Sequence, residues 1–109
     1  MQYDQAMEMR ILGLLRMEIP KTITVDELIK KISGSYEYWE DGASELVRQQ
    51  VVILNREGLV DVTSVSALEE GSNVEIWINT KGLEVFRAER QTEALNALLA
   101  KITPIRLYP

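Results

Sequence analysis

The N-terminal half of the chain repeats apolar residues at helical spacing in three separate segments. The first covers residues 3–17, and we expect it to end near Ile19 because a proline disfavours helix in the residue before it. A capping-box pattern, Thr24-Val25-Asp26-Glu27, predicts the start of a second helix over about residues 25–32. The third runs from about Ala43 to Glu57, with Gly58 as its C-cap. The three apolar stripes are Met7, Ile11, Leu14 and Leu15; Leu28, Ile29 and Ile32; and Leu46, Val47, Val51 and Leu54.

After the third helix the apolar pattern changes from helical spacing to alternation. Two alternating runs flank "EEGSN" at residues 69–73, which contains a glycine and is typical of a turn. Such a pattern predicts an antiparallel hairpin. Pleat alternation places Trp77 on its open face, together with Glu75 and Asn79. The residues expected on the buried face are Val60, Val62, Val74, Ile76 and Ile78.

The last segment returns to helical spacing. Thr80 is expected to cap this helix and Pro104 to limit its end. Its apolar positions are Leu83, Phe86, Leu95, Leu98, Leu99 and Ile102. The order is therefore helix, helix, helix, hairpin, helix, which predicts one α+β domain over residues 1–109. Within it, residues 92–109 form a C-terminal helix and tail.

Composition narrows the range of functions. The 109 residues include neither cysteine nor histidine, so we expect no enzyme, no metal site and no cofactor. Twelve Lys and Arg against seventeen Asp and Glu give a formal net charge of −5, so any DNA binding would need a local basic patch. No apolar stretch is long enough for a membrane span, and the N-terminus lacks the layout of a signal peptide. We therefore expect a cytoplasmic protein without membrane contact.

Two motifs carry a resemblance to a known superfamily. "VVILNREGLVDV", residues 51–62, is similar to the end of the recognition helix and the first wing strand of winged helix-turn-helix proteins. "IWINTKGLEVF", residues 76–86, is similar to the entry into the helix that follows the wing. MarR-like and PadR-like regulators show the nearest pattern, and the resemblance covers roughly residues 7–90. It implies a winged helix-turn-helix fold with three helices, a β-hairpin wing and a C-terminal helix.

The resemblance also implies where DNA would bind. The third helix would enter the major groove with Ser44, Arg48 and Gln49 facing outward, and Glu45 lies among them. Arg48 suits guanine and Gln49 suits adenine, while Ser44 suits a phosphate. The alternative is an ordinary solvated helix face. The cations available for phosphate contacts, or for solubility alone, are Lys30, Lys31 and Arg56, with Lys21 and Lys81 as further candidates.

Two groups of aromatic residues are candidates for a protein interface. Tyr36, Tyr38 and Trp39 precede the third helix and form either a partner surface or a lid over the core. Trp77, on the open face of the hairpin, either meets a partner or is covered by the last helix.

The last helix is the candidate dimer interface. Leu95, Leu98, Leu99 and Ile102 extend beyond what a winged-helix core requires, so we expect a symmetric homodimer formed through them. The alternative is docking onto the first helix of the same chain.

Two functions follow from these features. The first is a small DNA-binding transcriptional regulator of prokaryotic or mobile-element origin. The alternative is a winged-helix protein-interaction module or accessory subunit that does not bind DNA. The acidic balance and the acidic residues of "EEGSN" favour this alternative.

Overall fold

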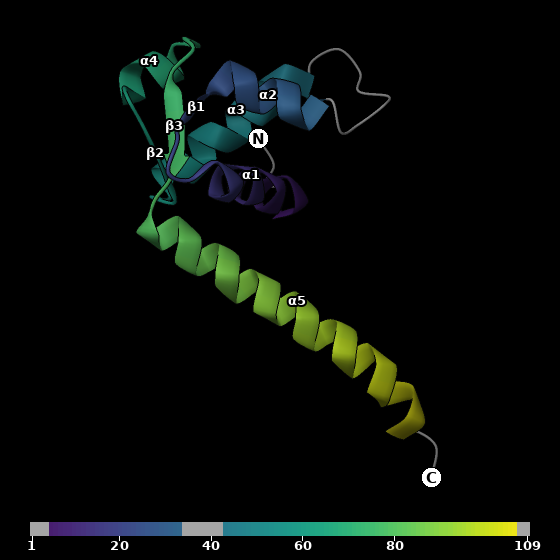
Figure 1. Cartoon of the computed structure of the whole chain (residues 1–109). Helices are drawn as coiled ribbons and strands as arrows, with labels where there is room; N and C mark the ends of the chain where they lie inside the picture. Colours follow the sequence, from purple (N-terminus) through teal and green to yellow (C-terminus); the bar gives the residue numbers. More distant parts are fainter. Residues whose placement is uncertain (1–4, 34–42, 107–109) are drawn as a thin grey trace.

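The computed structural model describes residues 5–33 and 43–106 and confirms an α+β fold. Five helices and a three-stranded antiparallel sheet of order β1-β3-β2 make up this part of the chain (Figure 1). The helices are α1 (Gln5–Glu18), α2 (Val25–Ser33), α3 (Ala43–Arg56), α4 (Val65–Glu69) and α5 (Thr80–Arg106). The strands are β1 (Ile23–Thr24), β2 (Val60–Val62) and β3 (Glu75–Ile78). The four predicted helices correspond to α1, α2, α3 and α5.

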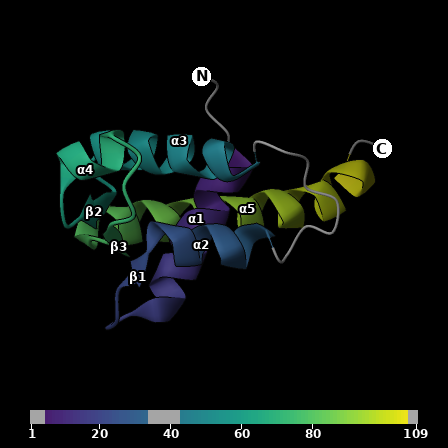
Figure 2. The same ribbon diagram turned by 90° about the horizontal axis from the view of Figure 1, so that it is seen from above.

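The core lies where α1, α2 and α3 meet one face of the sheet (Figure 2). Burying one large aliphatic side chain stabilises a fold by about 1.5–3 kcal/mol, so the stripes predicted from helical spacing supply most of the packing. Leu46 departs from its predicted stripe, because its side chain is 59% exposed. The fully buried side chains include Ile11 and Leu12 of α1, Leu28 and Ile32 of α2, and Val47, Val51 and Leu54 of α3.

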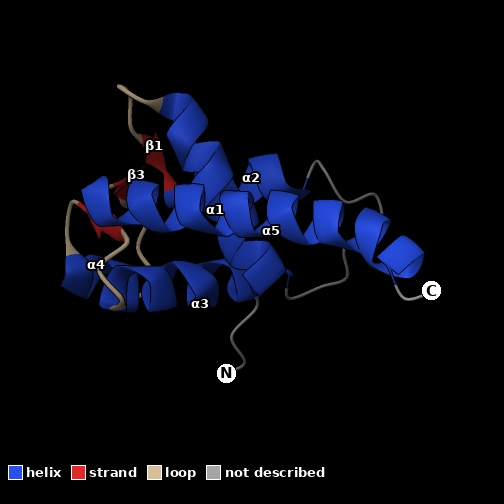
Figure 3. Ribbon diagram, turned by 90° about the horizontal axis from the view of Figure 1, so that it is seen from below, coloured by secondary structure: helices blue, strands red, loops and turns tan. Residues whose placement is uncertain are grey.

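The sheet confirms the predicted alternation and adds a strand (Figure 3). Val74, Ile76 and Ile78 are buried, and β3 pairs with β2 in the register Val60↔Ile78. The added strand β1 pairs with the other edge of β3 through Ile23↔Ile76. Two residues are too few to show alternation in a sequence, which is why β1 was not predicted.

The connection between β2 and β3 corrects the prediction of a simple turn. The chain forms the short helix α4 before the turn, and only Val60–Val62 is strand on the first side. Ser64 caps this helix by accepting a hydrogen bond from the Ala67 amide at 3.2 Å. Leu68 becomes buried as a result, which stabilises the helical path over a longer strand.

The predicted capping box of α2 is confirmed. The Thr24 amide donates to the carboxylate of Glu27 at 3.4 Å, and the Glu27 amide donates to the Thr24 hydroxyl at 3.2 Å. Asn73, from the turn before β3, accepts a hydrogen bond from the Asp26 amide at 2.9 Å. The first turn of α2 is therefore held both locally and by the β2–β3 connection.

The turn from α3 into β2 is held in place by hydrogen bonds from the residues that follow β3. Gly58 adopts the left-handed conformation, φ 78°, as predicted, and the amides of Gly58 and Leu59 bond back to the carbonyls of Asn55 and Leu54. The Asn79 side chain donates to the Gly58 carbonyl at 2.8 Å and accepts from the Gly82 amide at 2.9 Å.

The lysine and glycine after Asn79 complete this contact. Lys81 donates to the carbonyl of Glu57 at 2.9 Å. Gly82 approaches the carbonyl oxygen of Leu59 so closely that a Cβ at this position would overlap it. We call this contact between residues 57–59 and residues 79–82 the turn clamp. It joins the two sequence motifs that resemble winged-helix proteins.

Helix α5 leaves the body after its first turns and projects away from it (Figure 1). It has 27 residues, about 40 Å at 1.5 Å per residue. It also continues past Pro104 to Arg106, which corrects the predicted end. A proline lacks the amide that would bond to the carbonyl four residues earlier, and its ring crowds that carbonyl. It therefore weakens this last turn, and α5 ends two residues later at Arg106. Within residues 5–33 and 43–106, no helix combines the length and apolar character that crossing a membrane requires.

The turn clamp predicts opposite effects for two glycine-to-alanine substitutions in helices. Gly82→Ala should lower the free energy of unfolding by about 1–3 kcal/mol, because its Cβ would meet the Leu59 carbonyl and lie 2.7 Å from Ile78 Cγ1. Gly13→Ala in α1 is the control, since its Cβ would make ordinary contact with Phe86 at 3.4 Å. It should be neutral or stabilising by up to ~1 kcal/mol through helix propensity. Urea unfolding measures both, and equal effects would contradict the clamp.

Candidate functional site

The exposed side of α3 is the first candidate surface. Ser44 and Glu45 are exposed at the start of α3, and Gln49 is half-buried. A groove of about 430 Å³ runs between α3 and α4. Three carboxylates line it: Glu45 from α3, and Glu69 and Glu70 from the end of α4. Arg48 and Arg56 line the same groove, so its charges are mixed, with one more carboxylate than cations. Such a surface does not favour a phosphate backbone.

Arg48 corrects the prediction of an outward, base-facing residue. Its guanidinium is half-buried and donates to the carbonyl oxygens of Ser72 at 2.7 Å and Leu68 at 3.4 Å. Ser72 lies in the turn beyond α4, whereas the Leu68 carbonyl, near the end of α4, also accepts a hydrogen bond from the Gly71 amide at 3.1 Å. Arg48 therefore ties the β2–β3 connection to α3. The sequence could not show this, because the two partners lie 20 and 24 residues away.

Two of the cations predicted for phosphate contacts have carboxylate partners. Arg56 pairs with Glu69 at 3.4 Å, and Lys31 pairs with Glu18 at 3.2 Å. Lys30 and Lys21 are exposed, whereas Lys81 belongs to the turn clamp. The structure therefore divides these cations among several elements rather than gathering them beside α3.

Trp77 lies on the face of β3 opposite the core, as predicted, and is half-buried. It lines a groove of about 530 Å³ whose other wall is the turn after α1, including Ile19, Pro20 and Thr22. The residues beside it therefore come from this turn, and not from α5 as the alternative supposed. Tyr36, Tyr38 and Trp39 lie outside the described residues.

The leucines of α5 form an exposed apolar stripe. Leu95, Leu98 and Leu99 are 55%, 53% and 43% exposed. Phe86, nine residues before Leu95, is buried against the body, and nine residues are about 2.5 helical turns. The leucines therefore lie on the side of α5 away from α1. This arrangement contradicts the alternative in which they dock on the first helix of their own chain. The side chain of Ile102 lies outside those described.

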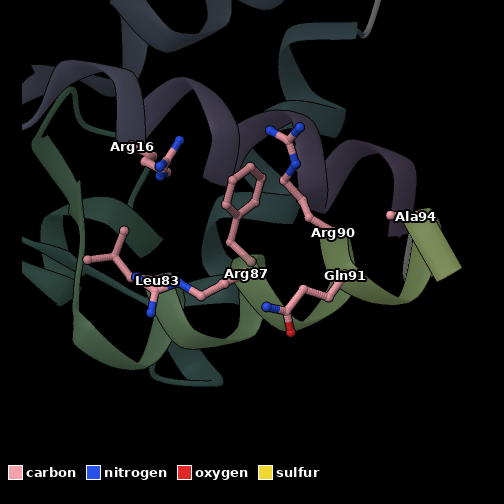
Figure 4. A pocket seen from close by; sticks show the side chains of 7 residues that line it. Arg16, Leu83, Arg87, Arg90, Gln91 and Ala94 are labelled. Carbon is pink, nitrogen blue, oxygen red and sulfur yellow. The ribbon is translucent and has the colours of Figure 1, made fainter.

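A pocket with three arginines lies where α5 crosses α1 (Figure 4). Its volume is about 370 Å³, and Arg16 of α1 faces Arg87 and Arg90 of α5 across it. The ring of Phe86 lies within cation–π range of Arg16 and Arg90. The remaining lining residues are Leu83, Gln91 and Ala94. The sequence did not predict this pocket, because more than seventy residues separate Arg16 from Arg87 and Arg90 and no local pattern brings them together.

Glu8 of α1 carries a buried carboxylate. The side chain of Glu8 in α1 is 1% exposed, and one of its oxygens has no hydrogen-bond partner within the described residues. Burial, followed by the charges of Glu89 and Glu57, raises the pKa of Glu8 to about 7. Burial, followed by the charges of Glu93 and Glu57, also raises the pKa of Glu89. Sequence analysis missed Glu8, because an acid in an amphipathic helix is normally exposed.

Glu8 predicts a pH dependence of stability. The folded protein holds this proton up to about pH 7, whereas an ordinary glutamate releases it near pH 4.5. The folded state therefore binds more protons between these values, so the free energy of unfolding falls as pH rises through this window. Glu8→Gln should remove this loss and stabilise the protein at pH 8 by up to about 3 kcal/mol. Urea titrations at pH 5 and pH 8 measure the difference.

The control is Glu84→Gln, which removes one carboxylate from an exposed position of α5. It should leave the pH dependence of stability unchanged. If the free energy of unfolding changes with pH by the same amount in the wild type and in Glu8→Gln, the role assigned to Glu8 is contradicted.

No family model matches this chain, and no curated protein or solved structure shows significant similarity to it.

Proposed function

We propose that this chain is a winged-helix protein that binds double-stranded DNA as a homodimer and acts as a transcriptional regulator of prokaryotic or mobile-element origin. The observation that carries the proposal is α3, which packs on α2 with its first turn exposed and is followed by the antiparallel strands β2 and β3. In helix-turn-helix proteins the second helix of such a pair enters the major groove with its N-terminal residues. Ser44 and Gln49 would then contact DNA, and Lys30 and Lys31 would contact phosphates.

The dimer part of the proposal is supported by α5. From residue 90 to residue 101 every described side chain of this helix is exposed, and three of them are leucines. A helix that presents a row of leucines to water is normally covered by a partner. Because the stripe lies on the side of α5 away from its own body, a second copy can pair with it through the same residues. Such self-complementary pairing produces a two-fold symmetric dimer.

One substitution on the stripe tests the dimer. Leu98→Glu should raise the dimer dissociation constant by about 100-fold or more, because it places an unpaired charge in the interface. Ala97→Glu is the matched control, since it adds the same charge to an exposed position on the side of α5 away from Leu95 and Leu99. Light scattering across a dilution series gives the mass of each. A monomeric wild type, or equal effects of the two variants, would overturn the dimer.

DNA binding is tested with a mixed pool of duplex DNA at two salt concentrations. We expect affinity to fall steeply with salt, because each neutralised phosphate releases counterions. Lys30→Gln should reduce the slope by about one contact, while Gln49→Ala should cost about 1–3 kcal/mol and relax the preference at one base pair. Glu75→Gln, on the exposed side of β3, is the control and should change neither. Absence of binding at low salt would overturn this function.

The second candidate is a winged-helix protein-interaction module that does not bind DNA. The observation that favours it is the groove beside α3, where Glu45, Glu69 and Glu70 gather and Arg48 is held by backbone carbonyls. A partner would use Trp77 and the segment with Tyr36, Tyr38 and Trp39. This function predicts no salt-dependent DNA binding, together with a change in tryptophan fluorescence when the partner is added.

A further inference from the structure

The pocket between α1 and α5 concentrates positive charge in an acidic protein. Three of its seven lining residues are arginines and none is a carboxylate, although the chain carries a net charge of −5. Lys31 and Arg56 each pair with a carboxylate, whereas Arg16, Arg87 and Arg90 form no ion pair with the described residues. A cation without such a pair attracts an anion from solution.

The arginines are also held in place by an aromatic ring. The guanidinium carbons of Arg16 and Arg90 lie 5.9 and 5.7 Å from the centroid of Phe86, within the range of cation–π contacts. Phe86 is itself buried against α1, where it contacts Gly13. A fixed ring therefore positions cations from two helices. Guanidinium groups bind carboxylates and phosphates through paired hydrogen bonds, so an acid group can be bound by one of these arginines, with the others adding positive charge nearby.

The floor of the pocket is apolar. Leu83, Phe86 and Ala94 are its apolar lining residues, and Leu83 and Ala94 lie toward its two ends (Figure 4). The volume of about 370 Å³ falls within the range of pockets that bind small molecules, and exceeds what a bare phosphate fills. A ligand with an apolar group beside its acid group would use both the floor and the arginines.

The two flanks of α5 around Phe86 differ in charge. Arg87, Arg90 and Gln91 follow one flank, whereas Glu89 and Glu93 fall on the other by the helical period. Glu93 does not line this pocket, but it lines a neighbouring groove together with Arg16, Phe86 and Arg90. Arg87 and Gln91 line the pocket and not this groove, so an anion that approaches from their side of α5 meets no carboxylate among the lining residues.

We propose that the pocket formed by Arg16, Arg87, Arg90, Leu83 and Phe86 binds a small organic anion that carries one carboxylate or phosphate on an apolar ring or chain. The arginines bind the acid group, and the apolar part lies on Leu83 and Phe86. This site does not depend on DNA binding. A protein that fails to bind DNA can still bind the anion, and the reverse also holds.

Calorimetry on the full chain with four probes separates the contribution of the acid group from that of the apolar ring. Phenyl phosphate and phenylacetate carry both an acid group and a ring, inorganic phosphate carries only the acid, and benzyl alcohol lacks the acid. We expect phenyl phosphate or phenylacetate to bind about tenfold or more tighter than inorganic phosphate and benzyl alcohol. The ratio of the dissociation constants of phenyl phosphate and phenylacetate tells whether phosphate or carboxylate is preferred. Equal binding of inorganic phosphate, equal binding of benzyl alcohol, or no saturable binding at millimolar concentrations would overturn the site.

Substitutions place the binding at the pocket. Arg87→Gln is the first variant, because Arg87 is exposed and its change leaves the Phe86 packing intact; it should weaken the preferred probe about tenfold. Arg90→Lys keeps the charge but loses the planar fork, and should weaken it by a smaller factor. Lys101→Gln, an exposed cation farther along the same helix, is the control and should leave affinity unchanged. An equal loss in the control, or no loss in Arg87→Gln, would overturn the assignment.

Discussion

The turn clamp is the contact on which the rest of the fold depends. The end of α3 and the start of α5 belong to different parts of the chain, and Asn79 and Lys81 fasten them by bonding to the carbonyls of Gly58 and Glu57. Gly82 lets the backbone of α5 come up against Leu59 without a side chain between them. This contact fixes where β2 begins, and it also fixes the direction in which α5 leaves the sheet.

The direction of α5 then decides which surfaces the molecule offers. Its first turns cross α1, bury Phe86 and create the arginine pocket on one flank. Its later turns run beyond the body and carry Leu95, Leu98 and Leu99 into solvent on the opposite side. One helix therefore has an inner face that packs on its own chain and an outer face with exposed leucines. A small change in the angle at the clamp would move both surfaces together, because the helix is continuous.

Electrostatics divides the same molecule into regions of opposite sign. Carboxylates gather beside α3 and around the buried Glu8, whereas arginines gather at the crossing of α1 and α5. Arg48 and Arg56 line the same groove as the acids beside α3, and Arg48 is held there by backbone carbonyls. This side of α3 therefore mixes both signs and is less basic than the pocket at the base of α5. Net charge alone could not show this, because it averages regions that lie far apart.

The sequence by itself determined the helices α1, α2, α3 and α5, the capping box of α2, the left-handed Gly58 and the buried face of β3. Each of these depends on residues within about one or two turns of each other, so local spacing is sufficient. The sequence did not determine β1, the fold of α4, the partners of Arg48, the burial of Glu8 or the arginine pocket. In these features the decisive neighbours lie far away along the chain, as Asn73 does from Asp26. Only packing in three dimensions brings such residues together, and that packing decided which charged side chains face water and which do not.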